Sequence, residues 1–498
     1  MSDFQRQHPV AALSRAFGLI RGNIVTILVF LFFGAQSESF SFWWWTAGGF
    51  AFLLIAGAAN WWRFLFKVED GLIHIKSGIF VRKNLYLTKD RIQVIDITAG
   101  VIQRIFGLVR LDIQTAGASS RAAAIEAITR EKAEEINQLL RRGEKQEEEG
   151  DESSVESIPE IKQTISLPNK ELLIAASTSG SFGIALSVIG TVFSQIEPLI
   201  SESQMYEYLY SILPSQTDTM FYIALIAGFV IFAWLLSFFG TLFKYGNFSL
   251  VVKEKEIVIS RGIFEKKRVT VPFNRIQAIH ISEGIIRQPL GYASVHLESA
   301  GYGDEKGTGS ILFFPLIKRN EILPLLDDVL PDYQKEMLAL TPPSRSLRRY
   351  IFRSAFLVTA LTALAWWRFD LNLAIWILPI LSLIWGWLKY NDTALGWGED
   401  ILVLRSRGLA KSTAYIKKKR VQDVSVSQSP FQRYRNLCSV QVHVASGDRG
   451  KSFSVRDLEL DDGLIILQQL KIEGMNTTIG EEFSPESIRQ IVRLPGWA

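Results

Sequence analysis

Six apolar runs that approach or reach membrane-spanning length dominate this sequence of 498 residues. A helix needs about 20 predominantly apolar residues to cross the hydrocarbon core of a bilayer. Arg21 and Arg353 interrupt the first and fifth runs near one end, where a long cationic side chain can reach the headgroups. The runs are 17–35, 42–60, 172–196, 219–243, 350–367 and 371–387. They come in pairs with tryptophan-rich ends, so we expect three transmembrane hairpins rather than buried core helices.

Positive charge is concentrated on one side of the three pairs, although the connection inside the third pair is Arg368-Phe369-Asp370. The connection inside the second pair, 197–218, carries four acidic residues and no lysine or arginine. Arg15 and Arg63 flank the first pair, while Lys244 and Lys389 follow the second and third pairs. Cytoplasmic flanks of membrane helices are enriched in lysine and arginine. We therefore expect a multi-pass protein of the bacterial cell (plasma) membrane, with both termini and every large soluble segment in the cytosol.

Several chemical classes are disfavoured by the composition. The single cysteine, Cys438, excludes an internal disulfide and a cysteine-based zinc cluster. The five histidines form no HxxxH or HExxH spacing, and no P-loop, GxSxG or CxxC motif occurs. The formal net charge of +4 gives no sign of a nucleic-acid partner. The sequence therefore predicts no catalytic residue, no cofactor and no metal site, and we do not expect an enzyme.

The soluble segments after the pairs are copies of one sequence pattern, aligned over 77–117, 261–301 and 407–447. An early glycine precedes an arginine-x-glutamine motif, and a later glycine follows it, with Asn436 replacing the later glycine in the third copy. Glycine and asparagine both tolerate a positive φ, so a tight turn is the shared requirement. The repeat-defining residues, for which we predict structural roles, are Gly78, Arg91, Gln93, Gly107, Gly262, Arg275, Gln277, Gly291, Gly408, Arg420 and Gln422.

Within each copy, apolar residues alternate with polar ones, which is typical of strands. Asp112, His296 and His443 share one aligned position between apolar neighbours, which predicts an outward-facing strand position and not a metal or acid–base site. Each copy then turns helical, over 126–142, 318–330 and 463–471. Several strands closed by one helix is the order of a pleckstrin-homology (PH)-like barrel or sandwich.

A helix pair followed by this block of glycine, arginine-x-glutamine and glycine resembles the bacterial PH-like domain family in its membrane-anchored form. The three-copy layout is similar to the YdbT-type proteins of Gram-positive bacteria, and the resemblance covers nearly the whole chain. It implies a seven-stranded β barrel with a C-terminal helix in each copy, a location in the membrane, and a scaffold or recognition role. It implies no established reaction and no catalytic residue.

The predicted fold class is membrane α + β, with three repeats of a transmembrane hairpin followed by a PH-like barrel or sandwich capped by a C-terminal helix. The predicted hairpins are 1–62, 169–243 and 345–389, and the predicted domains are 63–145, 244–335 and 390–498, the last with a further helix from Ser484 to about Val492. The stretch 146–168 is expected to be a disordered acidic linker, because most of it is rich in glutamate and serine.

Basic runs within the copies are candidate contacts with the anionic inner leaflet or with a partner, at about 1 kcal/mol per cation near the surface. An ordinary solvated face is the alternative. The runs are Arg82 and Lys83; Lys266, Lys267 and Arg268; and Lys417, Lys418, Lys419 and Arg420. The first two align, whereas the third is displaced by several residues. For the repeated arginines of the motif, we favour a salt bridge that fixes strand register or packs the domain on its own helix pair over a contact with a lipid phosphate or carboxylate.

None of the six runs has Asp, Glu, Lys or His in its middle, although ion-coupled transporters usually need such a group there. A transporter or channel component is therefore the second hypothesis. The leading one is a non-enzymatic integral membrane scaffold or sensor, with envelope stress or antimicrobial tolerance as a candidate setting. The expected partners are the lipid bilayer and another membrane protein, such as a shorter relative with one hairpin and one domain.

Overall fold

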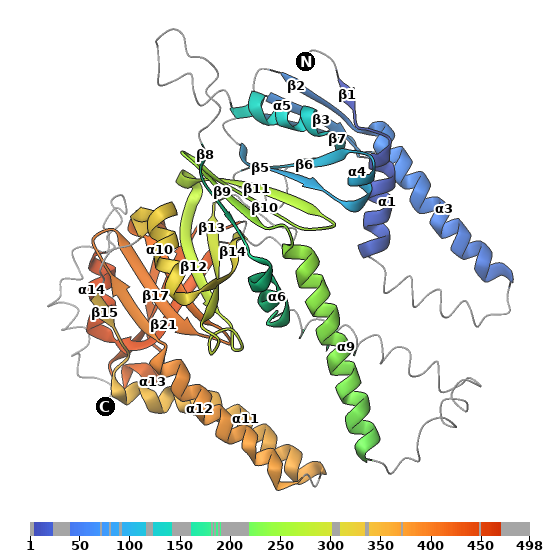
Figure 1. Cartoon of the computed structure of the whole chain (residues 1–498). Helices are drawn as coiled ribbons and strands as arrows, with labels where there is room; N and C mark the ends of the chain where they lie inside the picture. The colour runs from blue at the N-terminus through green and yellow to red at the C-terminus, as the bar shows by residue number, and fades with distance from the viewer. Residues whose placement is uncertain are drawn as a thin grey trace, which may run out of the picture. The chain divides into compact units, whose positions relative to one another are not determined.

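The chain, seen in a computed structural model, consists of antiparallel β-sheets and long helices (Figure 1). One order of seven strands, with helices after the first strand and a closing helix after the last, occurs three times along the chain. The described residues are 4–22, 40–69, 72–78, 81–88, 92–115, 123–141, 161–180, 219–300, 309–333, 338–369, 372–447 and 450–469, together with single positions between 183 and 190.

The first copy has a four-stranded sheet in the order β1-β2-β3-β4 and the strands β5, β6 and β7. The strands are β1 (Gln5–Arg6), β2 (Leu65–Glu69), β3 (Leu72–Ser77), β4 (Lys83–Thr88), β5 (Ile92–Ala99), β6 (Leu108–Thr115) and β7 (Ala123–Thr129). Helices α1 (Val10–Gly22) and α3 (Phe40–Arg63) stand between β1 and β2 in the sequence. The short helix α4 (Val101–Ile105) connects β5 to β6, and α5 (Arg130–Arg141) follows β7.

The second copy repeats this order. Its strands are β8 (Ile161–Ser166), β9 (Ser249–Lys253), β10 (Glu256–Arg261), β11 (Lys266–Pro272), β12 (Ile276–Glu283), β13 (Tyr292–Ser299) and β14 (Ser310–Lys318). Helices α6 (Asn169–Ser177) and α9 (Thr219–Tyr245) stand between β8 and β9, and α10 (Arg319–Val329) follows β14. The 3-10 turn η3 (Phe273–Arg275) leads from β11 into β12.

The third copy has the same elements. Its strands are β15 (Leu338–Leu340), β16 (Ala394–Trp397), β17 (Ile401–Arg407), β18 (Lys411–Lys417), β19 (Val421–Ser427), β20 (Leu437–Val444) and β21 (Lys451–Glu459). Helices α11 (Leu347–Phe369) and α12 (Ile377–Asn391) stand between β15 and β16, and α14 (Leu460–Gln469) follows β21. The 3-10 turn η7 (Lys418–Arg420) precedes β19, and α13 (Pro430–Arg433) connects β19 to β20.

In every copy the strand that precedes the helices lies beside the strand that follows them. The antiparallel pairs nearest the helices are Arg6 with Leu65, Ser166 with Ser249, and Leu340 with Leu395. The helices are therefore inserted between the first and second strands of each domain. Each copy thus has four strands up to the arginine-x-glutamine motif and three after it, and one helix follows the seventh strand.

This order differs from the predicted domain boundaries. The predicted domains began after the helices, so they omitted the first strand of each copy, and the predicted disordered linker included Ile161–Ser166, which is β8. The closing helix of the first copy begins at Arg130, not at 126, because Ala123–Thr129 forms β7. The predicted helix from Ser484 lies outside the described residues.

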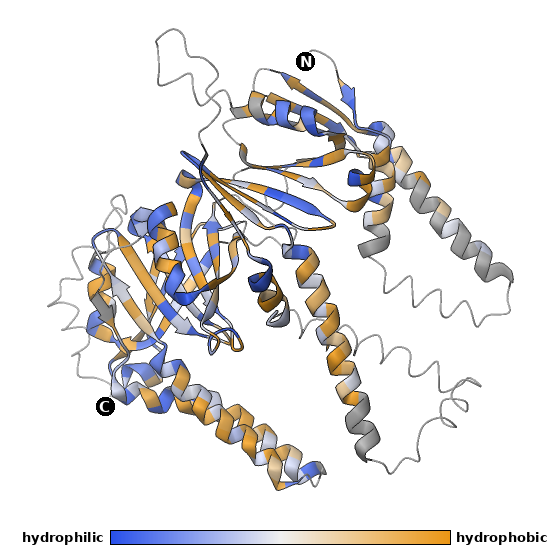
Figure 2. Cartoon of the chain, viewed as in Figure 1, coloured by the Kyte–Doolittle hydropathy of each residue, from blue (hydrophilic) through white to orange (hydrophobic). Residues whose placement is uncertain are grey.

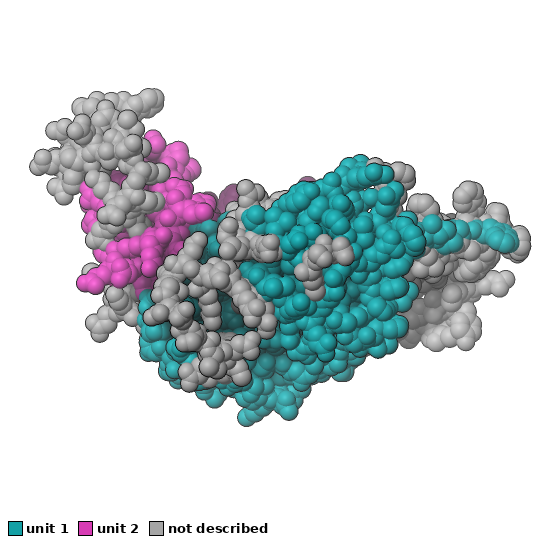
Figure 3. Space-filling model, turned by 90° about the horizontal axis from the view of Figure 1, so that it is seen from above, with its two compact units in different colours: residues 1–335, 408–415, 444–451 teal, residues 336–407, 416–443, 452–498 magenta. Residues whose placement is uncertain are grey.

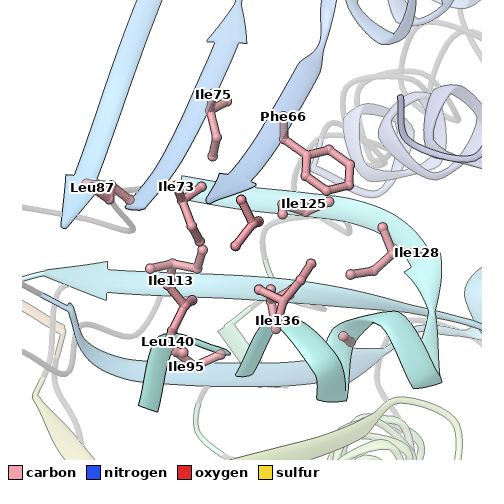
Figure 4. Close-up of a cluster of buried hydrophobic side chains, with 14 of the residues drawn as sticks. Phe66, Ile73, Ile75, Leu87, Ile95, Ile113, Ile125, Ile128, Ile136 and Leu140 are labelled. Carbon is pink, nitrogen blue, oxygen red and sulfur yellow. The ribbon is translucent and has the colours of Figure 1, made fainter. Parts of the chain in front are cut away.

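The core of the first copy lies between its two groups of strands, with α5 packed on the same cluster (Figure 4). Phe66, Ile73 and Leu87 point from β2, β3 and β4 toward Ile125 of β7 and Ile136 of α5. These side chains are the apolar members of the alternating pattern in each strand. Complete burial of one such side chain stabilises the fold by about 1.5–3 kcal/mol. The alternation predicted from the sequence therefore faces one interior.

Three helices within the described residues are long and apolar enough to cross a membrane (Figure 2). They are Ile226–Tyr245, Ser344–Arg368 and Leu373–Asn391, with hydropathy of 2.2, 1.3 and 1.6. In the second copy, Thr241 of α9 donates to the Ser179 hydroxyl over 2.8 Å, which ties α9 to the segment after α6. The predicted spans 17–35 and 172–196 extend largely beyond the described residues.

The chain divides into two compact units that do not follow the three copies (Figure 3). Unit 1 comprises 1–335, 408–415 and 444–451, and unit 2 comprises 336–407, 416–443 and 452–498. Within unit 1, β5 of the first copy pairs with β11 of the second, giving a seven-stranded sheet in the order β7-β6-β5-β11-β10-β9-β8. Residues 411–415 of β18 likewise lie beside β12 in unit 1, in the order β14-β13-β12-β18. Unit 2 contains β15-β16-β17 and the three-stranded sheet β19-β20-β21.

Candidate functional site: the helix–domain junctions and the strand edges

One polar side chain in each copy stands at a shared position and hydrogen-bonds to the first inserted helix of its copy or to strands of its own domain. It lies four residues before the turn that begins the next strand, and it is Gln103, Arg287 or Gln432. The turn residues have positive φ values, which are +66° for Gly107, +73° for Gly291 and +50° for Asn436. Asparagine is one of the few residues that tolerates this region, so the turn survives the loss of glycine in the third copy.

In the first copy, Gln103 connects α4 to α1. Its side-chain nitrogen donates to the Ser14 hydroxyl over 2.6 Å and to the Glu126 carbonyl over 3.5 Å, and the side chain is buried. Beside it, Arg110 lies 2.9 Å from the carboxylate of Asp112 and 3.2 Å from that of Glu126. Their mutual pairing joins β6 to β7, and Arg15 of α1 lies 3.8 Å from the same Glu126 carboxylate, so the largely buried cluster also contacts α1.

In the second copy, Arg287 stands at the same aligned position and contacts three groups. Its guanidinium donates to the Thr178 hydroxyl over 3.1 Å and to the carbonyls of Ala175 and Pro315 over 3.2 Å each. Ala175 lies in the last turn of α6, where helical carbonyls lack intrahelical partners and carry partial negative charge. Burial lowers the pKa of Arg287 below its ordinary value, although an arginine stays charged. The cation therefore closes the end of α6 and ties it to β14.

In the third copy, the junction is a buried ion-pair cluster around Asp457 of β21. Asp457 is fully buried and has a φ of +58°. Its carboxylate accepts from Arg349 of α11 over 3.1 Å, from Arg353 of α11, and from Gln432 of α13 over 2.9 Å. Tyr350 of α11 also donates to the Arg456 carbonyl over 2.5 Å. The contacts of Arg349, Tyr350 and Arg353 fasten the base of α11 to the domain, and Gln432 adds a bond from α13 to the same carboxylate.

These junction residues were not assigned from the sequence. Gln103, Arg287 and Gln432 were visible as a glutamine or arginine at a constant distance from the later turn, but a polar residue at a fixed spacing does not show what it touches. No aspartate stands at the position of Asp457 in the other copies, where Ala127 and Leu316 occur, so no repeat pattern marked it. Only the contacts in the folded structure show that an amide, a guanidinium and an ion-pair cluster occupy the equivalent junction in the three copies.

The basic runs do not all occupy the same place on their strands. Lys266, Lys267 and Arg268 begin β11, and their backbone pairs with Ala99, Thr98 and Ile97 of β5. Arg82 and Lys83 are exposed at the start of β4. The run of Lys417, Lys418, Lys419 and Arg420 covers the end of β18 and η7. The first two runs therefore begin equivalent strands, as their alignment predicted, and the third lies at the other end of its strand.

The repeat-defining glycines differ between copies. Gly78 and Gly262 have φ values of +101° and +106°, and a Cβ on them would lie 1.9 Å and 2.0 Å from the carbonyl oxygens of Val81 and Glu265. Gly408 does not adopt a positive φ, because its turn is one residue shorter. The predicted tight turn at this glycine therefore holds its left-handed form in two copies of three.

The arginine-x-glutamine motif has no single role among the described residues. Arg275 and Arg420 end η3 and η7, and the Arg275 carbonyl accepts from the buried Gln277 side chain over 3.0 Å. Gln422 is exposed. Arg91 and the side chain of Gln93 lie outside the part of the chain that is described.

The aligned Asp112, His296 and His443 lie on strands β6, β13 and β20, with their apolar neighbours in the domain core. Asp112 is nevertheless buried, because Arg110 covers it. His280 on β12 has its Nε2 2.7 Å from the Ser412 hydroxyl, and burial lowers the pKa of His280 to about 4 and that of His296 to about 3. Among the described residues, no group of three or more His, Cys, Asp or Glu is arranged to hold a metal ion.

The sequence matches a model of the bacterial PH domain three times, over 14–144, 203–326 and 352–473. The chain belongs to the bacterial PH domain family. A protein of Bacillus subtilis (strain 168), named UPF0699 transmembrane protein YdbT, is 35% identical over 494 residues, covering 95% of this chain and 99% of that protein. The family resemblance and the three-copy layout predicted from the sequence are therefore confirmed. Each match includes the helix that precedes β2, β9 or β16 and the strands that follow.

Proposed function

We propose that this protein is a non-enzymatic, multi-pass membrane scaffold or sensor, and that its three PH-like domains lie on the cytosolic side and act through their surfaces. The observation that carries the proposal is the pairing of strands across each helix insertion, Arg6 with Leu65, Ser166 with Ser249, and Leu340 with Leu395. This pairing brings the two ends of every insertion together.

Paired strands require each insertion to begin and end at the same level. Neighbouring strands lie about 4.8 Å apart, whereas one crossing of a bilayer displaces the chain by about 30 Å. An insertion between paired strands therefore crosses an even number of times or not at all. Because α9, α11 and α12 have spanning length and composition, two crossings per insertion is the simplest arrangement. This supports three hairpins with every domain on one side.

The charge distribution supports the cytosol as that side. Arg63, Lys244 and Lys389 lie in the last turns of α3, α9 and α12, next to the domains. The junction of the third copy adds Arg349 and Arg353 at the base of α11. Lysine and arginine favour the cytoplasmic ends of membrane helices.

The connection between the fourth and fifth strands after each insertion carries exposed apolar side chains that we propose meet the headgroup region. It adjoins the junction residue that contacts the membrane helix in the first two copies, and it joins the Asp457 cluster in the third. Apolar and aromatic groups at this depth suit the bilayer interface. The exposed residues are Val101, Ile105 and Phe106; Ile285, Ile286 and Leu290; and Phe431 and Tyr434. These loops are better candidates for lipid contact than the scattered basic runs.

A non-enzymatic role follows from the features common to the copies. These features are the core, the turns and the junction, which hold each domain on its hairpin. Three tethered copies of one surface raise the effective concentration for a multivalent partner. We propose that this partner is another membrane protein. A role in envelope stress or antimicrobial tolerance stays a prediction, and altered growth of a deletion strain under cell-wall antibiotics would test it.

The topology is tested by labelling cysteine variants with a membrane-impermeant thiol reagent in intact cells. The background is Cys438→Ser, which removes the single native cysteine. We expect Ser37→Cys, Ser203→Cys and Asn372→Cys to be labelled from outside, and Ser153→Cys only after permeabilisation. Labelling of Ser153→Cys in intact cells would invert the topology and remove the proposed cytosolic role.

The scaffold role is tested by crosslinking followed by purification from detergent-solubilised membranes. A recurrent membrane protein that co-purifies with the intact chain supports the scaffold. A co-purifying solute lost on mutation of a helix residue would instead support the transporter hypothesis. Turnover of any substrate by the purified protein, abolished by a point mutation, would overturn the non-enzymatic assignment.

A further inference from the structure

Consecutive copies are joined edge to edge by one repeated type of strand pairing. In the first junction, β5 is the edge strand of β7-β6-β5 in the first copy, and β11 is the edge strand of β11-β10-β9-β8 in the second copy. These two edge strands pair with one another. The pairing is antiparallel, with Lys266 opposite Ala99, Lys267 opposite Thr98 and Arg268 opposite Ile97. The contact therefore uses two different edges, one from each partner, which makes it heterologous.

The second junction within unit 1 joins the equivalent strands, β12 and β18. Lys411 of β18 stands nine residues before Arg420, as Lys266 stands nine before Arg275. Glu283 of β12 is the aligned counterpart of Ala99. Lys411 and Glu283 are both buried and form an ion pair of 3.1 Å, so the counterparts of Lys266 and Ala99 are in contact at this junction as well.

Two edges of these types are left over within the described residues. Strand β4 ends the sheet β1-β2-β3-β4 and is the counterpart of β11, while β19 ends the sheet β19-β20-β21 and is the counterpart of β5. Such an edge offers backbone N–H and C=O groups that can pair with a further strand. Lysine on an edge often discourages pairing. Here Lys266, Lys267 and Arg268 are paired although basic, so Arg82 and Lys83 on the β4 side are compatible with the same contact.

A second element of the first junction also recurs at the free end. Arg104 of α4 donates to the carbonyls of Ile263 and Phe264, the latter over 3.3 Å, beside the β5–β11 pairing. Arg433 of α13 stands three residues before Asn436, as Arg104 stands three before Gly107, and it is exposed next to β19. The β19 end therefore carries both the strand and the arginine that the first junction uses.

We propose that β19 of one copy of this chain pairs with β4 of a second copy, which repeats the strand pairing of the internal junctions between chains and gives a head-to-tail assembly in the membrane plane. The aligned register places Arg82 opposite Gln428, Lys83 opposite Ser427 and Asn84 opposite Val426. A second copy is the occupant that the structure favours, because the chain already forms this contact between its own domains. Hairpins in the bilayer would hold all domains at the same distance from the membrane surface, so the edges of two copies would lie at the same level. This step of the proposal rests on the proposed topology.

The proposal is tested by disulfide crosslinking between two differently tagged chains in the same membranes, both in the Cys438→Ser background. One chain carries Lys83→Cys and the other Ser427→Cys; both residues are exposed, so neither change disturbs the core. Under mild oxidation we expect a species of doubled mass that contains both tags. The internal pair Thr98→Cys and Lys267→Cys, which is opposed in the first junction, serves as the positive control.

The matched negative control combines Lys83→Cys with Gln422→Cys, an exposed residue on the same strand that is out of register by about 16 Å. Crosslinking of that pair to the same extent would overturn the proposed register. A disulfide that forms only inside a chain carrying both Lys83→Cys and Ser427→Cys would show self-closure and overturn the second copy. Capture of a shorter membrane protein by Ser427→Cys, in place of the tagged chain, would assign the edge to that partner. Absence of any disulfide while the internal control forms would also overturn the proposal. None of these results depends on labelling at Ser153, so the topology is judged separately.

Discussion

The buried carboxylate of Asp457 offers a sharp test of how a domain is held to its membrane helices. Replacing Asp457 with asparagine removes the charge that Arg349 and Arg353 contact, while a polar oxygen for Gln432 remains. Asparagine also tolerates the left-handed backbone that this position adopts, at a φ of +58°. The substitution therefore measures the ion pairs with little added backbone strain.

The expected size of the effect depends on burial. Removing one partner of a buried ion pair typically costs about 3–5 kcal/mol, since the other charge is left without compensation. The side chain of Arg353 is 36% exposed, so water screens its share, and that of Arg349 is 18% exposed. We therefore expect the lower end, about 3 kcal/mol. For a cooperative unit of about 150 residues, such as unit 2, that loss corresponds to a Tm lower by about 6–12 °C.

The single cysteine provides a readout confined to unit 2. Cys438 is buried on β20, so its thiol reacts only when the surrounding structure opens. In Asp457→Asn, the temperature at which half of Cys438 reacts with a thiol reagent should be about 6–12 °C lower than in the parent. Asp457→Ala should fall further, because an ordinary L-residue in the left-handed region costs about 1–2 kcal/mol.

Asp461→Asn is the matched control, because Asp461 is an exposed carboxylate in the adjoining helix α14. Its labelling midpoint should stay close to that of the parent, since exposed substitutions usually change stability by less than about 0.5 kcal/mol. If Asp457→Asn also shifts the midpoint by less than about 2 °C, equivalent to under 1 kcal/mol, the cluster does not hold the domain and the junction argument fails.

Two further outcomes are expected for unit 1. Gly262→Ala should destabilise it by about 1–3 kcal/mol, because the new Cβ would meet the Glu265 carbonyl at a φ of +106°. Gly284→Ala is the control, because a Cβ at that position meets nothing within 4 Å. Equal melting temperatures of the two variants in thermal circular dichroism would contradict the strained turn. The lowered pKa values of His280 and His296, about 4 and about 3, mean that the unfolded chain binds protons below about pH 6.5 while the folded chain does not. Stability should therefore fall from pH 6.5 to pH 4, by about 3 kcal/mol for His280 alone, and His280→Gln should flatten this profile; an unchanged profile would refute burial as the cause.

The repeat was predictable from the sequence because its signals are local. The turn residues Gly107, Gly291 and Asn436 mark one left-handed position, and the alternating apolar residues mark strands whatever their neighbours are. The insertion of the helices was not predictable in the same way. Strands as short as Gln5–Arg6 and Leu338–Leu340 contain too few residues to show alternation, so only their pairing across the helices reveals them.

The sequence by itself determined that the chain carries long apolar runs and three copies of one domain, because length, hydropathy and turn chemistry are properties of consecutive residues. Tertiary structure alone decided what joins those copies. The pairing of β5 with β11 depends on backbone groups that every residue has, and a basic run such as Lys266–Arg268 looks the same whether it faces lipid or lies on a shared strand edge. The junction residues Gln103, Arg287 and Asp457 likewise serve one place with different chemistry, since burial and geometry select the contact and not the residue type.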